Sequence, residues 1–293
     1  MHNPIGVITD GFQRGLWEGL SLAGELNVQG VQLYAVSGEM NPKTITVDTK
    51  KRLKEELQRN NLTISALCGD LGGHGFQDRS VNPEKIDMSK RILELAVEFG
   101  TPIVTTHIGI IPEEENHVYE TMLKACDELG TFASSLDAYF AVETGPEPAT
   151  RLKSFLDQLS TNGVSVNFDP ANMVMVTGDD PVQGIYILKD YIVHTHVKDG
   201  RKLGLVDPRD VYGELGYEPM SHAAIAEMVE NSTGFRETPL GQGSVPFDNY
   251  FQALKDIGYD GYLIVEREAG TNAFQNIKQA VQFLQARQTA KNI

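Results

Sequence analysis

The sequence lacks the features that mark disulfide-stabilised, secreted and membrane proteins. Among 293 residues it has two cysteines, Cys68 and Cys126, without CxxC spacing, which excludes a zinc ribbon and a thioredoxin-type site. Two buried free thiols in a reducing compartment are expected. No run approaches the ~20 apolar residues that span a bilayer, and the N-terminus lacks the basic and apolar regions of a signal peptide. The sequence therefore predicts a cytoplasmic protein without a membrane partner.

Positive charge is also scarce. The chain has 25 Lys and Arg against 40 Asp and Glu, which gives a net charge of −15. A broad phosphate-binding face depends on clustered Lys and Arg, so this balance argues against a nucleic-acid partner. A deep local site can still be positive, or hold a metal, on an acidic protein.

Short apolar runs alternate with longer amphipathic segments, a pattern typical of a parallel sheet with helical crossovers. Helix patterns follow nearly all of these runs. Eight such units in this length favour a single (β/α)₈ TIM barrel over residues 1–293. An open, doubly wound sheet is the alternative, but its glycine fingerprint is absent from the first turn, TDGFQRG. The strand candidates are residues 5–9, 31–35, 63–68, 103–107, 139–143, 164–169, 191–196 and 262–266.

One connection is much longer than the others. It covers approximately residues 198–243, between the seventh strand and its helix, and is punctuated by Gly and Pro. It includes one helical pattern, at 221–230. Long insertions after barrel strands usually carry function, so we expect this one to lie over the C-terminal rim of the barrel.

Four consecutive strands are predicted to end in a metal-binding side chain that faces inward. Successive strand residues point to opposite faces, and the apolar face of each strand should meet the helices. The other face then carries Glu143, Asp169, His196 and Glu266 to the C-terminal rim, where barrel active sites are built. A single carboxylate at a strand end could instead cap a helix or form a salt bridge.

Three carboxylates that converge cannot all stay ionised unless a cation holds them. The set is rich in oxygen and has one imidazole, which suits one divalent metal ion. Mn²⁺ fits best, with Mg²⁺, Co²⁺ and Zn²⁺ as alternatives. We therefore predict a metal site at this rim.

With these strand ends in view, the chain resembles the xylose isomerase-like TIM barrels, a superfamily of sugar and sugar-phosphate isomerases and epimerases. The resemblance covers essentially the whole chain. It is specific for the superfamily but not for a substrate. Its motifs are THIG (106–109), VETG (142–145), NFDPAN (167–172), HTHVKD (194–199), LGQGSVPF (240–247) and GYLIVE (261–266).

The resemblance implies that Glu143, Asp169, His196 and Glu266 are the metal ligands. In the ketose 3-epimerases of this superfamily, the two glutamates also act as the acid/base pair. This chain departs from those enzymes at two positions. Asn172 replaces a His three residues after the Asp, and Lys202 replaces an Arg six residues after the ligand His.

Further residues are candidate substrate contacts, and each has a plainer interpretation. His107 ends the fourth strand and could instead be a core histidine; His74 follows the third strand in LGGHGF. Lys198 and Arg201 could meet an anionic or hydroxyl-rich substrate, or lie in solvent as loop charges. Asn172 completes the candidates by its place beside Asp169. His194, one layer below His196, is expected in the core.

The expected chemistry is proton transfer through an enediolate of a small sugar, sugar phosphate or polyol, as in an isomerase or epimerase. A metal-dependent lyase such as an inosose dehydratase would use the same site and expel water. An apurinic endonuclease-like enzyme would need more histidines, and a non-catalytic sugar-binding protein would lack one of the glutamates. The oligomeric state stays open, with a homodimer or homotetramer among the alternatives.

Overall fold

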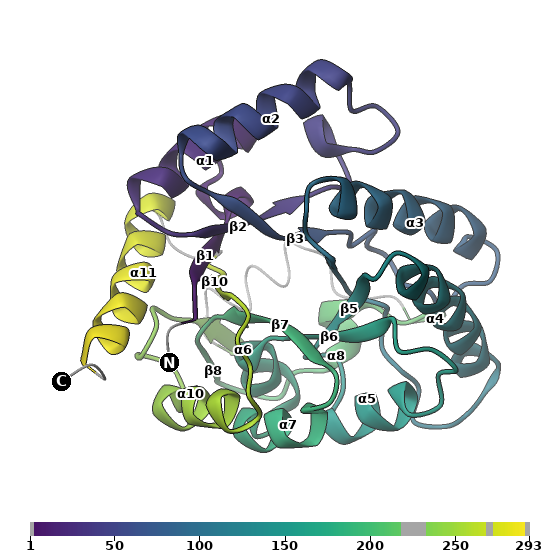
Figure 1. The fold of residues 1–293 in the computed structure, drawn as a ribbon. Helices are drawn as coiled ribbons and strands as arrows, with labels where there is room; N and C mark the ends of the chain where they lie inside the picture. The colour runs from purple at the N-terminus through teal and green to yellow at the C-terminus, as the bar shows by residue number, and fades with distance from the viewer. Residues whose placement is uncertain (1–2, 218–232, 268–271, 291–293) are drawn as a thin grey trace.

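The eight apolar runs predicted as strands form a closed parallel barrel with helices around its outside (Figure 1). This computed structural model describes residues 3–217, 233–267 and 272–290. The order around the barrel is β1-β10-β7-β6-β5-β4-β3-β2, which confirms the predicted (β/α)₈ barrel over the open sheet. The barrel strands are β1 (Ile5–Ile8), β2 (Gly30–Tyr34), β3 (Thr63–Cys68), β4 (Ile103–Thr106), β5 (Tyr139–Glu143), β6 (Val164–Phe168), β7 (Ile192–Val197) and β10 (Leu263–Val265).

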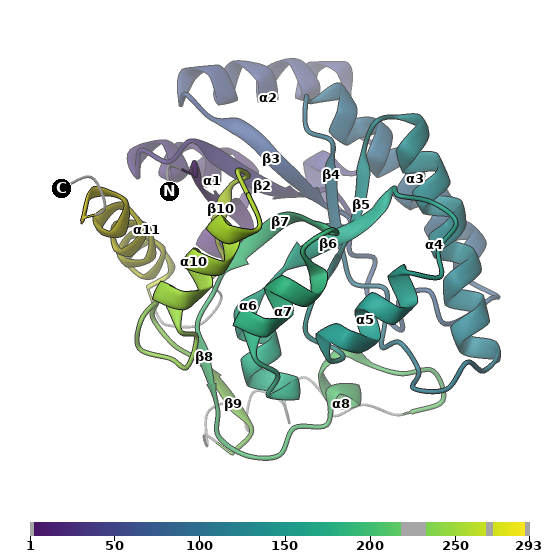
Figure 2. The same cartoon turned by 60° about the horizontal axis from the view of Figure 1, so that its bottom comes forward.

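The outer helices cover the barrel on all sides, as the two views show (Figures 1 and 2). They form because an apolar stripe on each meets the sheet; in α2, for example, Leu53 and Leu57 are buried while most of the other side chains are at least partly exposed. The longer helices are α1 (Gly15–Glu25), α2 (Val47–Arg59), α3 (Asn82–Glu98), α4 (His117–Ser135), α5 (Ala149–Leu156), α7 (Pro181–Leu188), α10 (Phe247–Asp256) and α11 (Ala273–Ala290).

Strand alternation sorts the apolar and polar side chains as expected. Phe140 and Val142 of β5 are fully buried between the sheet and its helices. Glu143 pairs in register with Asn167 of β6, and Ile264 of β10 pairs with His196 of β7. Because all these strands run parallel, their carboxyl ends share one rim, and the polar residues of four strands meet there.

Strand boundaries differ from the predicted ones by one residue at several ends. Asp169 and Glu266 each follow their strand rather than end it, and β7 continues one residue beyond His196. Each strand ends where its backbone hydrogen bonds to the neighbouring strand end. The alternation of apolar and polar residues does not locate that end to a single residue.

The long insertion contains structure that the sequence pattern did not indicate. Strands β8 (Gly200–Lys202) and β9 (Phe235–Glu237) form an antiparallel hairpin, and α8 (Pro208–Tyr212) lies in the segment between them. Figure 2 shows these elements beyond one end of the barrel. The helical pattern at 221–230 lies outside the described residues.

Across the three described ranges, no helix has both the length and the apolar character needed to cross a lipid bilayer.

Candidate metal and active site

A cavity of about 290 Å³ opens at the carboxyl ends of the barrel strands. Its polar side is built from strand ends, including Glu143, His196 and Glu266. Its other side comes from β8, β9 and the segment around them. The insertion and its flank contribute Lys198, Val211, Tyr212, Phe235 and Glu237. A barrel rim and a loop segment therefore share one enclosed space.

The structure brings the four predicted ligands together. One ligand atom from each of Glu143, Asp169, His196 and Glu266 lies within 4.8 Å of those of the other three, and all four residues are buried. They come from β5 and β7 and from the residues that follow β6 and β10. The register described above produces this convergence, since each residue occupies the same level of the barrel.

Asp169 has two roles, one for each carboxylate oxygen. Its Oδ1 accepts the backbone N–H groups of Ala171 at 2.7 Å and Asn172 at 2.9 Å, and so caps the short helix α6 (Pro170–Asn172). Its Oδ2 is buried and has no hydrogen-bond donor among the described residues. The alternative of a helix cap is thus realised together with the convergence, because capping uses only one oxygen.

An unsatisfied oxygen indicates that the cluster can hold a cation. Oδ2 of Asp169 is buried without a hydrogen-bond donor in the described part of the chain, whereas Oε2 of Glu266 faces Nδ1 of His196 and Nζ of Lys198. A buried carboxylate oxygen without a partner is costly. A divalent ion placed between the four ligand atoms would satisfy Oδ2 of Asp169, and the oxygen-rich set with one imidazole suits such an ion.

The imidazole of His196 is oriented by a hydrogen bond to the side chain of Gln32. Its Nε2 lies 3.1 Å from Oε1 of Gln32, and its Nδ1 lies 3.0 Å from Oε2 of Glu266. Burial alone would lower the pKa of His196, but the carboxylates of Glu143 and Glu266 outweigh it and hold the pKa well above its ordinary value. Gln32 thus directs Nδ1 toward the cluster, a role that sequence reasoning missed.

His194 lies one layer deeper, as expected. It is fully buried, and its Nδ1 lies 2.9 Å from Oδ1 of Asn167. Burial and the neighbouring His196 lower its pKa well below the ordinary value, so His194 is neutral. It supports the cluster without joining it.

Glu143 is held by amide groups on both oxygens. Asn172 donates from Nδ2 to Oε1 at 2.8 Å, and Asn167 donates from Nδ2 to Oε2 at 3.0 Å. Asn172 lines the cavity. These two bonds fix the direction of the carboxylate before any ligand binds, which is the requirement for a precisely placed ligand or base.

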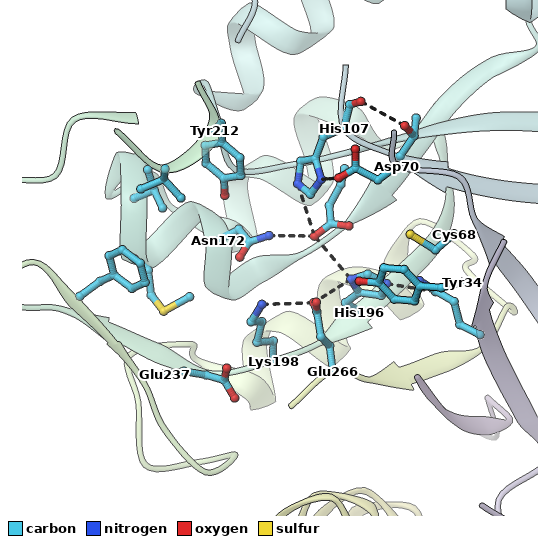
Figure 3. A pocket seen from close by; sticks show the side chains of 17 residues that line it. Tyr34, Cys68, Asp70, His107, Asn172, His196, Lys198, Tyr212, Glu237 and Glu266 are labelled. Atoms are coloured by element: carbon cyan, nitrogen blue, oxygen red, sulfur yellow. Dashed lines mark hydrogen bonds and ion pairs between the residues drawn. The ribbon is translucent and has the colours of Figure 1, made fainter. Parts of the chain in front are cut away.

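Asp70 and His107 form a second acid/base pair on the cavity wall. Nδ1 of His107 lies 3.1 Å from Oδ2 of Asp70, and its Nε2 lies 3.8 Å from Oε1 of Glu143 (Figure 3). Burial would lower the pKa of His107, but Glu143 and then Asp70 outweigh it and raise the pKa to about 9. Asp70 was not predicted, although it follows the end of β3 by two residues.

Two other predicted contacts behave differently. Lys198 lines the cavity with its Nζ 3.4 Å from Oε2 of Glu266. Arg201 instead donates from Nε and Nη2 to the backbone carbonyl of Gln242, at 2.9 and 2.6 Å. Lys198 directly follows β7 at the barrel rim, whereas Arg201 lies in β8 of the hairpin. The structure does not bring Arg201 to the cavity.

His74 is also outside the cavity lining. Its ring packs close to Gly213 of the insertion, and its Nδ1 is buried without a hydrogen-bond partner in the described ranges. The loop that carries it is held by Lys85, which donates to the carbonyls of Gly72 and Gly75. This loop therefore supports the insertion rather than reaching the cluster.

Comparison with known protein families gives a match over most of the sequence. A family described as xylose isomerase-like TIM barrel matches residues 20–287. The chain is also similar to inosose dehydratases from Lacticaseibacillus casei, 28% identical over 49% of this chain and 44% of that protein, and from Bacillus anthracis, 28% identical over 60% and 56%. The chain thus spans about half the length of these curated relatives.

Solved structures share the fold over nearly the whole chain. A xylose isomerase domain protein from Planctomyces limnophilus has 24% identity and a TM-score of 0.78, covering 99% of this chain and 98% of that one. A D-tagatose 3-epimerase-like protein has 17% identity and a TM-score of 0.72, covering 97% of each. A xylose isomerase-like TIM barrel protein from Mycobacterium smegmatis in complex with magnesium has 14% identity and a TM-score of 0.69, covering 97% of each.

Proposed function

This chain belongs to the xylose isomerase-like TIM barrel family, and we propose that it is a divalent-metal-dependent lyase. It would remove the proton next to the carbonyl group of a small polyhydroxylated ketone and expel a neighbouring hydroxyl as water. The observation that carries the proposal is the pairing of the four-residue cluster with a separate acid/base pair, His107 and Asp70, on the same cavity.

Glu143, Asp169, His196 and Glu266 would hold the metal, and Mn²⁺ is the ion we propose because three carboxylates and one imidazole suit it. When bound, such an ion polarises a carbonyl group and acidifies the neighbouring C–H bond.

Glu266 is the proposed base. Burial would raise the pKa of its carboxyl group, but Lys198 and then His196 outweigh it and lower the pKa. Glu266 is therefore ionised at neutral pH and able to accept a proton. Lys198, 3.4 Å from Oε2, keeps the carboxylate charged without transferring its own proton.

His107 is the proposed acid for the leaving hydroxyl. Asp70 accepts from Nδ1, so Nε2 is the nitrogen left facing the cavity, and it has no hydrogen-bond partner among the described residues. Its neighbours favour the protonated ring. The step balances: the C–H proton passes to Glu266, the C–O bond breaks, and the proton of His107 converts the departing hydroxide into water.

Epimerisation or isomerisation is the second candidate, and two observations favour it. Both glutamates that an epimerase would use as base and acid are present and buried side by side. The D-tagatose 3-epimerase-like protein shares the fold. The inosose dehydratases, in contrast, are similar in sequence at 28% identity, which is why we place loss of water first.

The decisive experiment follows proton and water separately. The Mn²⁺-loaded protein is incubated in D₂O with a panel of neutral ketoses and cyclic polyol ketones. A lyase gives a product that has lost one water and has new ultraviolet absorbance, whereas an epimerase gives an isomer of the substrate that is heavier only by the deuterium it gains. Mass-conserving turnover alone would refute the lyase and leave the second candidate.

A pair of variants separates the proposed roles. His107→Asn should lose water expulsion by at least ~10²-fold while substrate deuterium exchange continues, because the base remains. Glu266→Gln should lose both. If His107→Asn loses exchange and elimination equally, His107 is not the acid for the leaving group.

A further inference from the structure

The insertion supplies a wall of the cavity that differs from the strand rim in chemistry. Its cavity side chains are Val211 and Tyr212 of α8 and Phe235 and Glu237 of β9. Three of the four are apolar or aromatic. The cluster and its neighbouring residues, by contrast, are charged or amide side chains.

Tyr212 is the best-placed side chain of this wall. Its ring centroid lies 5.3 Å from that of His107, with 36° between the planes. Figure 3 shows Tyr212 beside His107, with its hydroxyl directed toward Asn172. Burial, followed by the charge of Glu143, raises the pKa of Tyr212 well above its ordinary value. The phenol therefore stays protonated and offers a neutral O–H donor to the cavity.

Gly145 in the VETG motif makes room for this phenol. Its φ is +138°, and a Cβ there would lie 2.5 Å from the Tyr212 hydroxyl oxygen and 2.6 Å from Cβ of Asn172. Contacts this short are not tolerated by a side chain, so the strand-5 motif and the insertion fit each other only with glycine at this position. The placement of Tyr212 is thus built into the barrel as well as into the insertion.

The side-chain charges that line the cavity, leaving aside the proposed metal ion, offer little to an anion. Four carboxylates line it, and two of them, Glu143 and Glu266, are proposed metal ligands; the others are Asp70 and Glu237. Its Lys and His cations are already engaged, Lys198 and His196 with Glu266 and His107 with Asp70. No arginine of the described residues lines it.

Arg267, the residue after Glu266, does not change this balance, because it forms an ion pair with Glu237 and does not line the cavity.

We propose that the wall contributed by the insertion restricts the site to an uncharged polyhydroxylated ketone, with the Tyr212 hydroxyl as a donor to one of its oxygens. Val211 and Phe235 pack against the C–H groups of that substrate. Apart from the proposed metal ion, the described lining offers a phosphate ester no cation that is not already paired, so burying the phosphate costs more than burying an uncharged hydroxyl. The inference rests on the proposed function, since it names the substrate class of the same site.

The test compares matched neutral and phosphorylated ketoses. Dissociation constants for D-fructose and D-fructose 6-phosphate, and for D-xylulose and D-xylulose 5-phosphate, are measured by titration calorimetry on the Mn²⁺-loaded protein, together with a cyclic polyol ketone. We expect at least one neutral compound to bind and each ester to bind at least ~10-fold more weakly than its parent. Tighter binding of an ester than of its parent, or no binding by any neutral compound, would overturn the proposal.

A charge placed on the wall sharpens the test. Val211→Lys introduces a cation into the cavity and should shift the ester-to-parent ratio toward the ester by at least ~10-fold. Leu203→Lys adds the same charge to an exposed insertion residue outside the lining and should leave the ratio unchanged. Equal ratios in both variants would show that the wall does not set the selectivity.

Failure of the proposed function looks different from failure of this inference. A neutral ketone that binds but neither exchanges deuterium nor reacts leaves the inference standing and removes the lyase. An ester that reacts in preference to its parent keeps the proton chemistry and removes the selectivity. A second cavity adjoins the first at Val176 and holds Lys202, so loss of such ester turnover in Lys202→Gln would show where the phosphate binds.

Discussion

The two sides of the cavity were built by different means. On the strand side, Glu143 and His196 occupy positions fixed by the hydrogen-bond register of β5 and β7. On the insertion side, Tyr212 is the last residue of α8, a five-residue helix within a long connection. A regular sheet repeats its geometry, whereas a loop depends on its own contacts. We therefore expect the chemistry to reside on the strand side and the selectivity on the insertion side.

Removing a cluster side chain should give the largest effect. His196→Ala should lose the metal and lower turnover on the order of 10³-fold or more, because polarisation of the carbonyl contributes several kcal/mol. His194→Ala is the matched control, since the residue is equally buried but lies one layer deeper. Elemental analysis and thermal shift on adding Mn²⁺ measure the difference.

Equal loss of metal in the two histidine variants would contradict the assignment of His196 as the ligand. Loss in neither would show that the strand side does not hold the ion at all. In wild-type protein, Mn²⁺ should raise thermal stability, since an ion that binds only the folded state stabilises it by about 2.7 kcal/mol at 100 times its dissociation constant.

Substitution of the two glutamates should reduce deuterium exchange to different extents. Glu266→Gln should abolish deuterium exchange and lower turnover by ~10²–10⁴-fold, the range for a missing general base. Glu143→Gln should exchange deuterium faster than Glu266→Gln, because the proposed base is still present. Proton nuclear magnetic resonance in D₂O follows both. Complete loss of exchange in both variants, with the metal retained in each, would contradict the assignment of Glu266 as the single base.

On the insertion side the expected effect is smaller. Tyr212→Phe removes the O–H donor but keeps the ring beside His107, and should raise KM by about three- to tenfold, in line with one neutral hydrogen bond. Metal affinity should not change. A fall in kcat with unchanged KM would mean that Tyr212 contributes to the chemical step, and the proposed division between the two sides would fail.

The smallest effect on activity should come from a buried carboxyl group outside the cavity lining, that of Glu147. Burial raises the pKa of Glu147 to about 7, and its Oε2 accepts the N–H of Ile111 at 3.2 Å. Because the ordinary pKa of a glutamate carboxyl is 4.5, the folded state holds a proton that the unfolded chain releases, and stability falls as pH rises from about 4.5 to about 7.

Glu147→Gln should remove this pH-dependent loss of unfolding free energy, which amounts to roughly 3 kcal/mol for a pKa raised from 4.5 to about 7. The variant should match wild type near pH 5 and exceed it in unfolding free energy near pH 8, with activity little changed. Denaturant unfolding at the two pH values measures it, with Glu113→Gln as a control at an exposed carboxylate. A variant equally stable or less stable at pH 8 would contradict the prediction.

The sequence alone determined the barrel and the four converging side chains. The strands are strongly apolar and regularly spaced, and side-chain alternation follows from backbone geometry, so Glu143, Asp169, His196 and Glu266 could be placed at one rim without coordinates. Errors of one residue at Asp169 and Glu266 did not matter, because both still reach the rim.

Only the tertiary structure decided what surrounds that cluster. Asp70 pairs with His107, Gln32 orients His196, and Tyr212 closes the cavity, yet each comes from a separate part of the chain. Their sequence neighbourhoods carry no periodic signal that points to these partners. The position of Arg201 could not be decided from sequence for the same reason, since the β8–β9 hairpin that carries it is formed by segments more than thirty residues apart. Local backbone preferences set the strands, whereas these contacts depend on long-range packing.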